Sequence, residues 1–266
     1  MQYSGNGARL PAAATGKEAQ MVLLAQISDL HFDGTARSAE RAGRVLDYLR
    51  RLPTPVDAVL VTGDIADTGE PAQYEQAAKV LTGPFPILTC PGNHDDRSEY
   101  RRVLLGEPAG PGPANRAHLI GGTAILMCDS SVPGQSAGRL DPETLAWLAE
   151  TLDGLTPGTP VLIAFHHPPV ILHHAMIDSI RLQHADELAE LLAGHPEVVA
   201  LLTGHAHTAA VSTFADRPIV VAPGVFWTLR MSWEGDDVVD WSQPAAIAFH
   251  VLDEQNRLTT HYRSVL

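Results

Sequence analysis

Residues that can bind metal ions recur along the chain in five short clusters, each directly after an apolar run. The clusters are DLH at 29–31, GDIAD at 63–67, GNHDD at 92–96, HH at 166–167 and GHAH at 204–207. Imidazole and carboxylate ligands together suit zinc, iron and manganese better than calcium, and no cysteine accompanies them to form a thiolate site. The set therefore predicts a metal-dependent active site.

Each cluster taken alone is weak evidence. A histidine after a strand is more often a hydrogen-bonded core or surface residue than a ligand, and an isolated Gly-Asp pair is usually a turn. Asp67 is more readily explained as a structural residue than as a ligand, and the role of His167 stays open because Pro168 constrains it. The prediction depends on five clusters occurring in order, each at the end of an apolar run.

The elements that must position these clusters alternate between strands and helices. We expect buried strands at 22–27, 58–62, 86–89, 124–128, 161–165 and 198–202. We expect helices near 45–52, 74–81, 98–105, 141–152 and 185–192. Four later segments alternate like antiparallel strands, at 211–214, 219–221, 246–252 and 258–262. This order predicts an α/β fold, in which ligand-binding loops gather at the carboxyl ends of strands.

Composition limits the substrates that this protein can bind. The chain has 266 residues, 45% of them hydrophobic, and carries 18 Lys and Arg against 31 Asp and Glu, a formal net charge of -13. Phosphate polymers and anionic membranes are bound by Lys/Arg-rich surfaces, so a polymeric nucleic acid is not expected as a partner. A small phosphorylated substrate remains possible, because bound metal ions supply local positive charge.

Cellular location is predicted from cysteine usage and the amino-terminal segment. Cys90 and Cys128 follow apolar runs and are expected to be buried free thiols, as suits the cytoplasm. No stretch is long and apolar enough for a membrane span. Residues 1–20 have no signal-peptide core and are expected to be a weakly ordered arm, with one domain over 21–266.

The motif order resembles that of the calcineurin-like metallophosphoesterases, from Leu24 to the final strands. GNHDDR at 92–97, SVPG at 131–134 and HHPP at 166–169 make the chain more similar to the branch of class III cyclic-nucleotide phosphodiesterases. The resemblance implies a four-layer αββα fold, with two mixed β-sheets packed face to face and flanked by helices. It also implies a homodimer.

Carrying the family motifs over implies two metal ions, of manganese, iron or zinc. Asp29, His31 and His207 would hold the first ion. Asn93, His166 and His205 would hold the second, and Asp64 would bridge both.

The resemblance also implies the catalytic chemistry. Two ions about 3.5–4 Å apart clamp a phosphoryl oxygen and activate a bridging water, whose hydroxide attacks phosphorus. His94 would face the substrate phosphate and protonate the leaving group, with Asp95 orienting its ring.

The motifs specify the reaction centre and leave the substrate open. Small phosphodiesters are expected, first of all 3′,5′-cyclic nucleotides. Glycerophosphodiesters and 2′,3′-cyclic nucleotides are the alternatives, and a non-catalytic scaffold on the same fold is the alternative from another class.

An aromatic segment at 223–244 follows the last cluster and holds three of the four tryptophans. Phe226 and Trp227 either pack in the core or a dimer contact, or line the substrate site and stack on a nucleobase.

Overall fold

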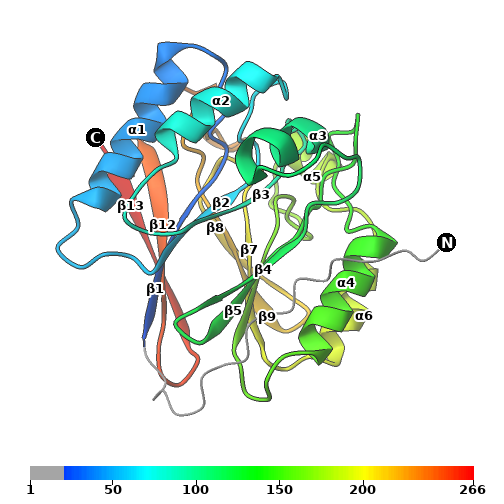
Figure 1. The fold of residues 1–266 in the computed structure, drawn as a ribbon. Helices are drawn as coiled ribbons and strands as arrows, with labels where there is room; N and C mark the ends of the chain where they lie inside the picture. Colours follow the sequence, from blue (N-terminus) through cyan, green and yellow to red (C-terminus); the bar gives the residue numbers. More distant parts are fainter. Residues whose placement is uncertain (1–20) are drawn as a thin grey trace.

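Four layers make up the fold, two helical layers outside and two β-sheets between them (Figure 1). The computed structural model describes residues 21–266, so the predicted arm over residues 1–20 lies outside the described part. The predicted αββα arrangement is confirmed. No described helix is long and apolar enough to cross a membrane.

The first sheet has five strands in the order β13-β12-β1-β2-β3. Its strands are β1 (Val22–Ile27), β2 (Ala58–Thr62), β3 (Ile87–Cys90), β12 (Ala245–Leu252) and β13 (Leu258–Val265). β1, β2 and β3 run parallel, so their carboxyl ends meet at one edge, whereas β12 and β13 are antiparallel to their neighbours.

The second sheet has six strands in the order β4-β5-β6-β7-β9-β8. They are β4 (Arg116–Ile120), β5 (Thr123–Met127), β6 (Val161–Ala164), β7 (Val198–Thr203), β8 (Ala210–Phe214) and β9 (Arg217–Val221). The four central strands, β5, β6, β7 and β9, are parallel. β4 and β8 close the two edges as antiparallel partners.

Helices cover the outer face of each sheet (Figure 1). α1 (Ala36–Arg50) and α2 (Pro71–Val80) pack on the first sheet, and α4 (Pro142–Asp153) and α6 (Ala185–Ala193) pack on the second. α4 begins as expected, because the Asp141 side chain accepts a hydrogen bond from the backbone N–H of Thr144 at 2.8 Å. Between the sheets lies a core of aliphatic side chains such as Leu24, Leu60 and Leu162.

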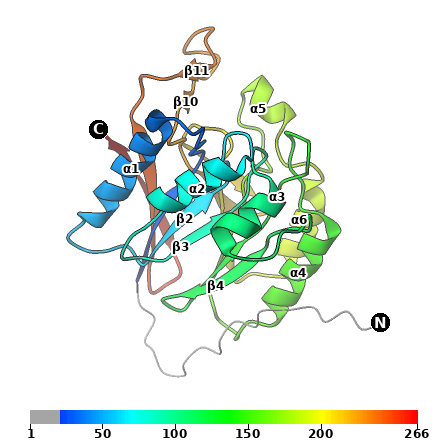
Figure 2. The same ribbon diagram turned by 45° about the horizontal axis from the view of Figure 1, so that its top comes forward.

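The structure adds elements that the sequence pattern did not predict. β4 was overlooked because all five of its residues are only half-buried, which removes the apolar signal. The helix expected at 98–105 is a short α3 (Arg97–Glu99) followed by a π-helix, Tyr100–Leu105. α5 (Ala175–Ser179) and the hairpin of β10 (Thr228–Leu229) and β11 (Val239–Asp240) also appear; the hairpin extends outward beyond the start of α1 (Figure 2).

Candidate metal centre

All seven predicted ligands lie in loops at the carboxyl ends of parallel strands. The first sheet contributes four of them, after β1, β2 and β3: Asp29, His31, Asp64 and Asn93. The second sheet contributes three, after β6 and β7: His166, His205 and His207. The site therefore lies where the two sheets meet at one edge of the fold.

The backbone of the ligand loops is strained. Five of the seven ligands adopt positive φ angles, from 42° to 67°: Asp29, His31, Asp64, His205 and His207. Residues with a Cβ rarely adopt this left-handed conformation, and it persists where the surrounding structure enforces it. Two hydrogen bonds show this enforcement, from the N–H of Asp29 to the carbonyl of Gly63 and from the N–H of His31 to the carbonyl of Asp64.

Asp29, His31, Asp64 and His207 form the first group of side chains, and their ligand atoms lie within 4.8 Å of one another. The Asp29 Oδ1 is 3.3 Å from the His207 Nε2, which in turn is 3.1 Å from the His31 Nε2. All four side chains are buried.

His166 and His205 form the second group of side chains, to which the motif order adds Asn93 as a predicted member. The His166 Nε2 lies 3.2 Å from the His205 Nδ1. The Asn93 Oδ1 is buried and accepts no hydrogen bond from any residue in 21–266. His167, whose role the sequence left open, lies beside this group, with its Nδ1 bonded to the Ser130 Oγ at 2.8 Å.

Asp64 stands between the two groups. Its Oδ2 is 3.7 Å from the His31 Nε2 and 3.2 Å from the His166 Nε2. A single carboxylate thus faces the imidazoles of both groups, which is the position required of a bridging ligand.

Hydrogen bonds at the outer nitrogens orient the rings toward the centre. The Nδ1 of His31 donates to the Asp67 carboxylate, and the Nδ1 atoms of His166 and His207 donate to the carbonyls of Thr62 and Trp227. In a neutral ring each inward Nε2 then carries a lone pair, as a metal ligand does.

The residues present fit two cations. The Nε2 atoms of His31 and His207 are 3.1 Å apart, and in neutral rings their lone pairs face each other, which a cation between them would resolve. Both carboxylate oxygens of Asp29 are buried without a hydrogen-bond partner within residues 21–266. Buried polar groups are rarely left unpaired unless an ion or water satisfies them.

The charges at the site are unevenly distributed. Burial alone would lower the pKa of His166, but the carboxylates of Asp64 and Asp29 raise it to about 9, so this ring balances their negative charge. Burial lowers the pKa of His205 to about 3 and that of His207 well below its usual range, so both rings are neutral donors of a lone pair. Burial alone would raise the pKa of Asp64, but His166 and the neighbouring histidines hold it well below its usual range. Burial raises the pKa of Asp29 to about 6. A cation would stabilise this buried charge.

Gly92 and Gly63 allow the ligand loops to approach one another. A Cβ at Gly92 would overlap the Asp64 carboxylate, and one at Gly63, where φ is 89°, would overlap the His166 ring. Any larger residue here would displace a ligand, which explains why glycine precedes the polar residue in both motifs.

Asp67 has a role that sequence reasoning missed. Its Oδ1 lies 3.0 Å from the His31 Nδ1, and this hydrogen bond holds the pKa of Asp67 below its usual range. A carboxylate bonded to the outer nitrogen of a ligating histidine fixes the ring and raises its basicity. The spacing of Asp67, three residues after Asp64 in the GDIAD motif, was the feature of the sequence that could have indicated this role.

His94 is exposed and lies at the mouth of the site. Its ring centroid is 4.7 Å from that of His31. The expected contact between Asp95 and the His94 ring is wrong, because the His94 Nδ1 donates instead to the carbonyl of Asp67 at 2.6 Å. The Asp95 carboxylate accepts from the backbone N–H groups of Ile65, Ala66 and Gly92 and so holds two ligand loops together.

A buried polar network lies between the sheets beneath the ligands. The Gln26 Nε2 donates to the Thr62 Oγ1 and to the carbonyl of Thr203, both at 2.9 Å. These threonines end β2 and β7, one residue before the glycines of GDIAD and GHAH. The Gln26 Oε1 accepts from His250, and Gln26 thereby ties together the strand ends that carry Asp64 and His205.

Phe226 and Trp227 lie against the ligands. The Trp227 ring stacks on His207, with centroids 3.5 Å apart and planes at 17°. The Phe226 ring is 6.3 Å from that of His31 and is only 7% exposed. The backbone N–H of Phe226 donates to the carbonyl of Asp29, which fixes the aromatic segment beside the first ligand loop.

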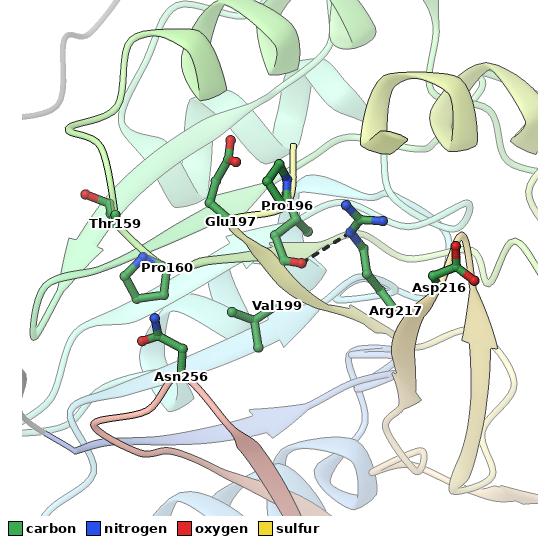
Figure 3. A pocket seen from close by; sticks show the side chains of 10 residues that line it. Thr159, Pro160, Pro196, Glu197, Val199, Asp216, Arg217 and Asn256 are labelled. Carbon is green, nitrogen blue, oxygen red and sulfur yellow. Dashed lines mark hydrogen bonds between the residues drawn. The ribbon is translucent and has the colours of Figure 1, made fainter. Parts of the chain in front are cut away.

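A hollow of about 540 Å³ lies at the opposite edge, where β6 and β7 begin (Figure 3). Arg217 is the cation in its lining, and its guanidinium already donates to the carbonyls of Val198, Ala215, Leu192 and His195. This hollow contains none of the predicted ligands.

Comparison with known proteins gives the family. The family model for calcineurin-like phosphoesterases matches residues 22–209. A cAMP/cGMP dual specificity phosphodiesterase of Mycobacterium tuberculosis is 36% identical over 219 residues, covering 77% of this chain and 68% of the relative. A glycerophosphodiester phosphodiesterase of Enterobacter lignolyticus is 32% identical over 252 residues, covering 88% of each chain.

Solved structures share the fold. A dimetal phosphatase from Danio rerio superposes with a TM-score of 0.68 at 15% identity, covering 92% of this chain and 96% of that one. The protein belongs to the calcineurin-like phosphoesterase family. Together with the clustered ligands, this membership makes it a metal-dependent hydrolase of phosphoric diesters.

Proposed function

We propose that the enzyme hydrolyses 3′,5′-cyclic nucleotides at a dinuclear centre. The observation that carries this proposal is the seven-ligand cluster with Asp64 between its two halves, in a chain 36% identical to a cAMP/cGMP phosphodiesterase. Asp29, His31 and His207 would hold one ion, Asn93, His166 and His205 would hold the other, and Asp64 would be shared. Two bound ions supply charge stabilisation and an activated water.

His94 provides the proton chemistry. Because its Nδ1 donates to the carbonyl of Asp67, its Nε2 carries a lone pair in the neutral ring and a proton in the imidazolium. The imidazolium donates to a phosphoryl oxygen and then transfers its proton to the departing alkoxide. Asp95 acts indirectly, because its hydrogen bond with the backbone N–H of Gly92 stabilises the loop that carries His94.

Phe226 and Trp227 form the wall that receives the nucleoside. Trp227 supports His207 on one face, so Trp227→Ala is expected to reduce hydrolysis of every substrate. Phe226→Ala, in contrast, is expected to raise KM for cyclic AMP more than for a diester without a base. Equal losses on both substrates in the Phe226 variant would assign this ring to the core.

A glycerophosphodiester is the second candidate substrate. The relative from Enterobacter lignolyticus is named for that activity and matches 88% of both chains. The deciding experiment is a substrate panel: 3′,5′-cyclic AMP and GMP, 2′,3′-cyclic AMP, a glycerophosphodiester and a phosphomonoester, each with Mn²⁺, Fe²⁺ and Zn²⁺. The proposal requires the highest kcat/KM for a 3′,5′-cyclic nucleotide with at least one metal.

We further propose that the enzyme works in the cytoplasm as a homodimer with manganese, iron or zinc. Cys90 and Cys128, both buried and unoxidised, support a reducing compartment. The nitrogen and oxygen ligands accept any of these metals. Light scattering coupled to gel filtration tests the dimer, and elemental analysis tests the metals.

A further inference from the structure

Two arginines one turn apart on α1 hold the aromatic segment against the metal centre. Arg41 is buried, with its Nε donating to the carbonyl of Val225 at 2.8 Å and its Nη2 to that of Gln243 at 2.9 Å. Both ends of the segment are thereby attached to α1. Arg37 lies four residues earlier and therefore faces the same segment.

Arg37 packs on an aromatic ring. Its guanidinium carbon is 4.5 Å from the centroid of Trp241 and 6.0 Å from that of Phe226. Within residues 21–266 no carboxylate forms an ion pair with this guanidinium. Its N–H groups form no hydrogen bond with a residue in 21–266, so these donors are available to a ligand.

Arg37 and Trp241 are connected to the ligand cluster through the ring of Phe226. Trp241 meets Phe226 edge-on at 5.4 Å, and Phe226 lies 6.3 Å from the His31 ring. Trp241 is 45% exposed whereas Phe226 is 7% exposed. Of these two rings, Trp241 is therefore the one that a ligand can reach from solvent. In a nucleotide the ribose separates the phosphate from the base. With the phosphate at the metal ligands, the base can therefore extend past Phe226 toward Trp241.

We propose that Arg37 and Trp241 form a nucleobase subsite that favours guanine over adenine, an inference that depends on the proposed nucleotide substrate. Trp241 holds the guanidinium over its ring by a cation–π contact, so that a base binds beside Arg37. The Arg37 guanidinium supplies two parallel donors, which match the adjacent O6 and N7 acceptors of guanine. Adenine has an acceptor, N7, and an N–H donor, the N6 amino group, at the same edge. The N6 donor would face an arginine N–H, which is also a donor, so one hydrogen bond is lost.

The test is equilibrium binding to the metal-loaded enzyme, measured by calorimetry with GMP, AMP and ribose 5-phosphate. Wild-type enzyme should bind GMP about fivefold or more tightly than AMP. Arg37→Gln should abolish this difference and leave the Kd of ribose 5-phosphate unchanged. Trp241→Leu should reduce the preference for GMP over AMP, because Trp241 acts by holding the Arg37 guanidinium in place. Arg44→Gln, at an exposed arginine on the same helix, should change none of these constants.

Three results would overturn the subsite. They are equal Kd values for all three ligands, a GMP preference that survives in Arg37→Gln, and a loss of ribose 5-phosphate binding in Arg37→Gln equal to the loss of GMP. The proposed function is tested separately, by turnover of cyclic nucleotides. An enzyme that binds GMP through Arg37 but hydrolyses only glycerophosphodiesters would retain the subsite and refute the proposed substrate.

Discussion

The carboxylate of Asp67 accepts a hydrogen bond from the His31 Nδ1 at 3.0 Å, although the two residues belong to loops after different strands. The bond fixes which nitrogen of His31 points to the centre. Asp67 thereby supports the proposed metal site through the His31 ring.

Asp67→Asn should weaken binding at the first metal site about 10- to 100-fold, because an amide cannot match the carboxylate in orienting the ring and raising its basicity. The measurement is a competitive chelator titration of each variant. Asp47→Asn is the matched control, since that carboxylate pairs only with Arg50 on the surface of α1. Equal affinities in the wild type and Asp67→Asn would make Asp67 purely structural.

Asp64→Ala should disturb both metal sites, because its carboxylate faces the histidines of both groups. Asn93→Ala should preferentially empty the second site, because it removes a neutral ligand from that group alone. Elemental analysis of protein purified without chelator should approach two metal equivalents in the wild type. Full metal content and activity in Asp64→Ala would contradict the bridging role.

His94→Gln should keep its metal and lose turnover by about 100-fold, the scale expected when a general acid or phosphoryl-oxygen donor is removed. The readouts are kcat on a diester and metal content of the same preparation. His261→Gln, at an exposed histidine on β13, serves as the control. Loss of metal from the His94 variant would instead place this residue among the ligands.

Protonation of His250 should destabilise the fold in acid. Burial lowers the pKa of His250 from 6.5 to about 3. Its Nε2 donates to Gln26 and its Nδ1 accepts from Thr260, so both nitrogens of the neutral ring are already satisfied. Its contribution to the free energy of unfolding is complete above pH 6.5 and is lost as the pH falls toward 3.

Urea unfolding as a function of pH checks this prediction. Between pH 6 and 4 the wild type should lose up to about 1.4 kcal/mol per pH unit more than His250→Gln, the slope for one proton bound only in the unfolded chain. Parallel slopes for the two proteins would show that His250 does not take up a proton on unfolding.

The sequence could predict a ligand set because its signal is local: each predicted ligand follows an apolar run, and parallel strands bring such loops to one edge. It did not identify the residues that orient them. The Asp67–His31 hydrogen bond and the Gln26 network join residues far apart in the chain. A short sequence motif cannot predict such contacts. The Asp95 prediction, which the family resemblance implied, was wrong because the partner of the His94 Nδ1 is the carbonyl of Asp67 in another loop.

The aromatic segment shows the same limit. Its composition left open whether the aromatic residues pack in the core or line the substrate site, because the stacking of Trp227 on His207 depends on how residues 224–227 run beside the end of β1. The π-helix after α3 was also hidden, since its residues have the spacing of an ordinary helix.

Because the ligands come from both sheets, metal supply and protein lifetime are coupled in this enzyme. Ions that bind only the folded chain add about 2.7 kcal/mol per site when their free concentration is one hundred times their dissociation constant. Chelation should therefore lower the melting temperature as well as abolish turnover. A cell short of these ions would lose the enzyme's activity first and then, as proteases degrade the unfolded chains, the protein itself.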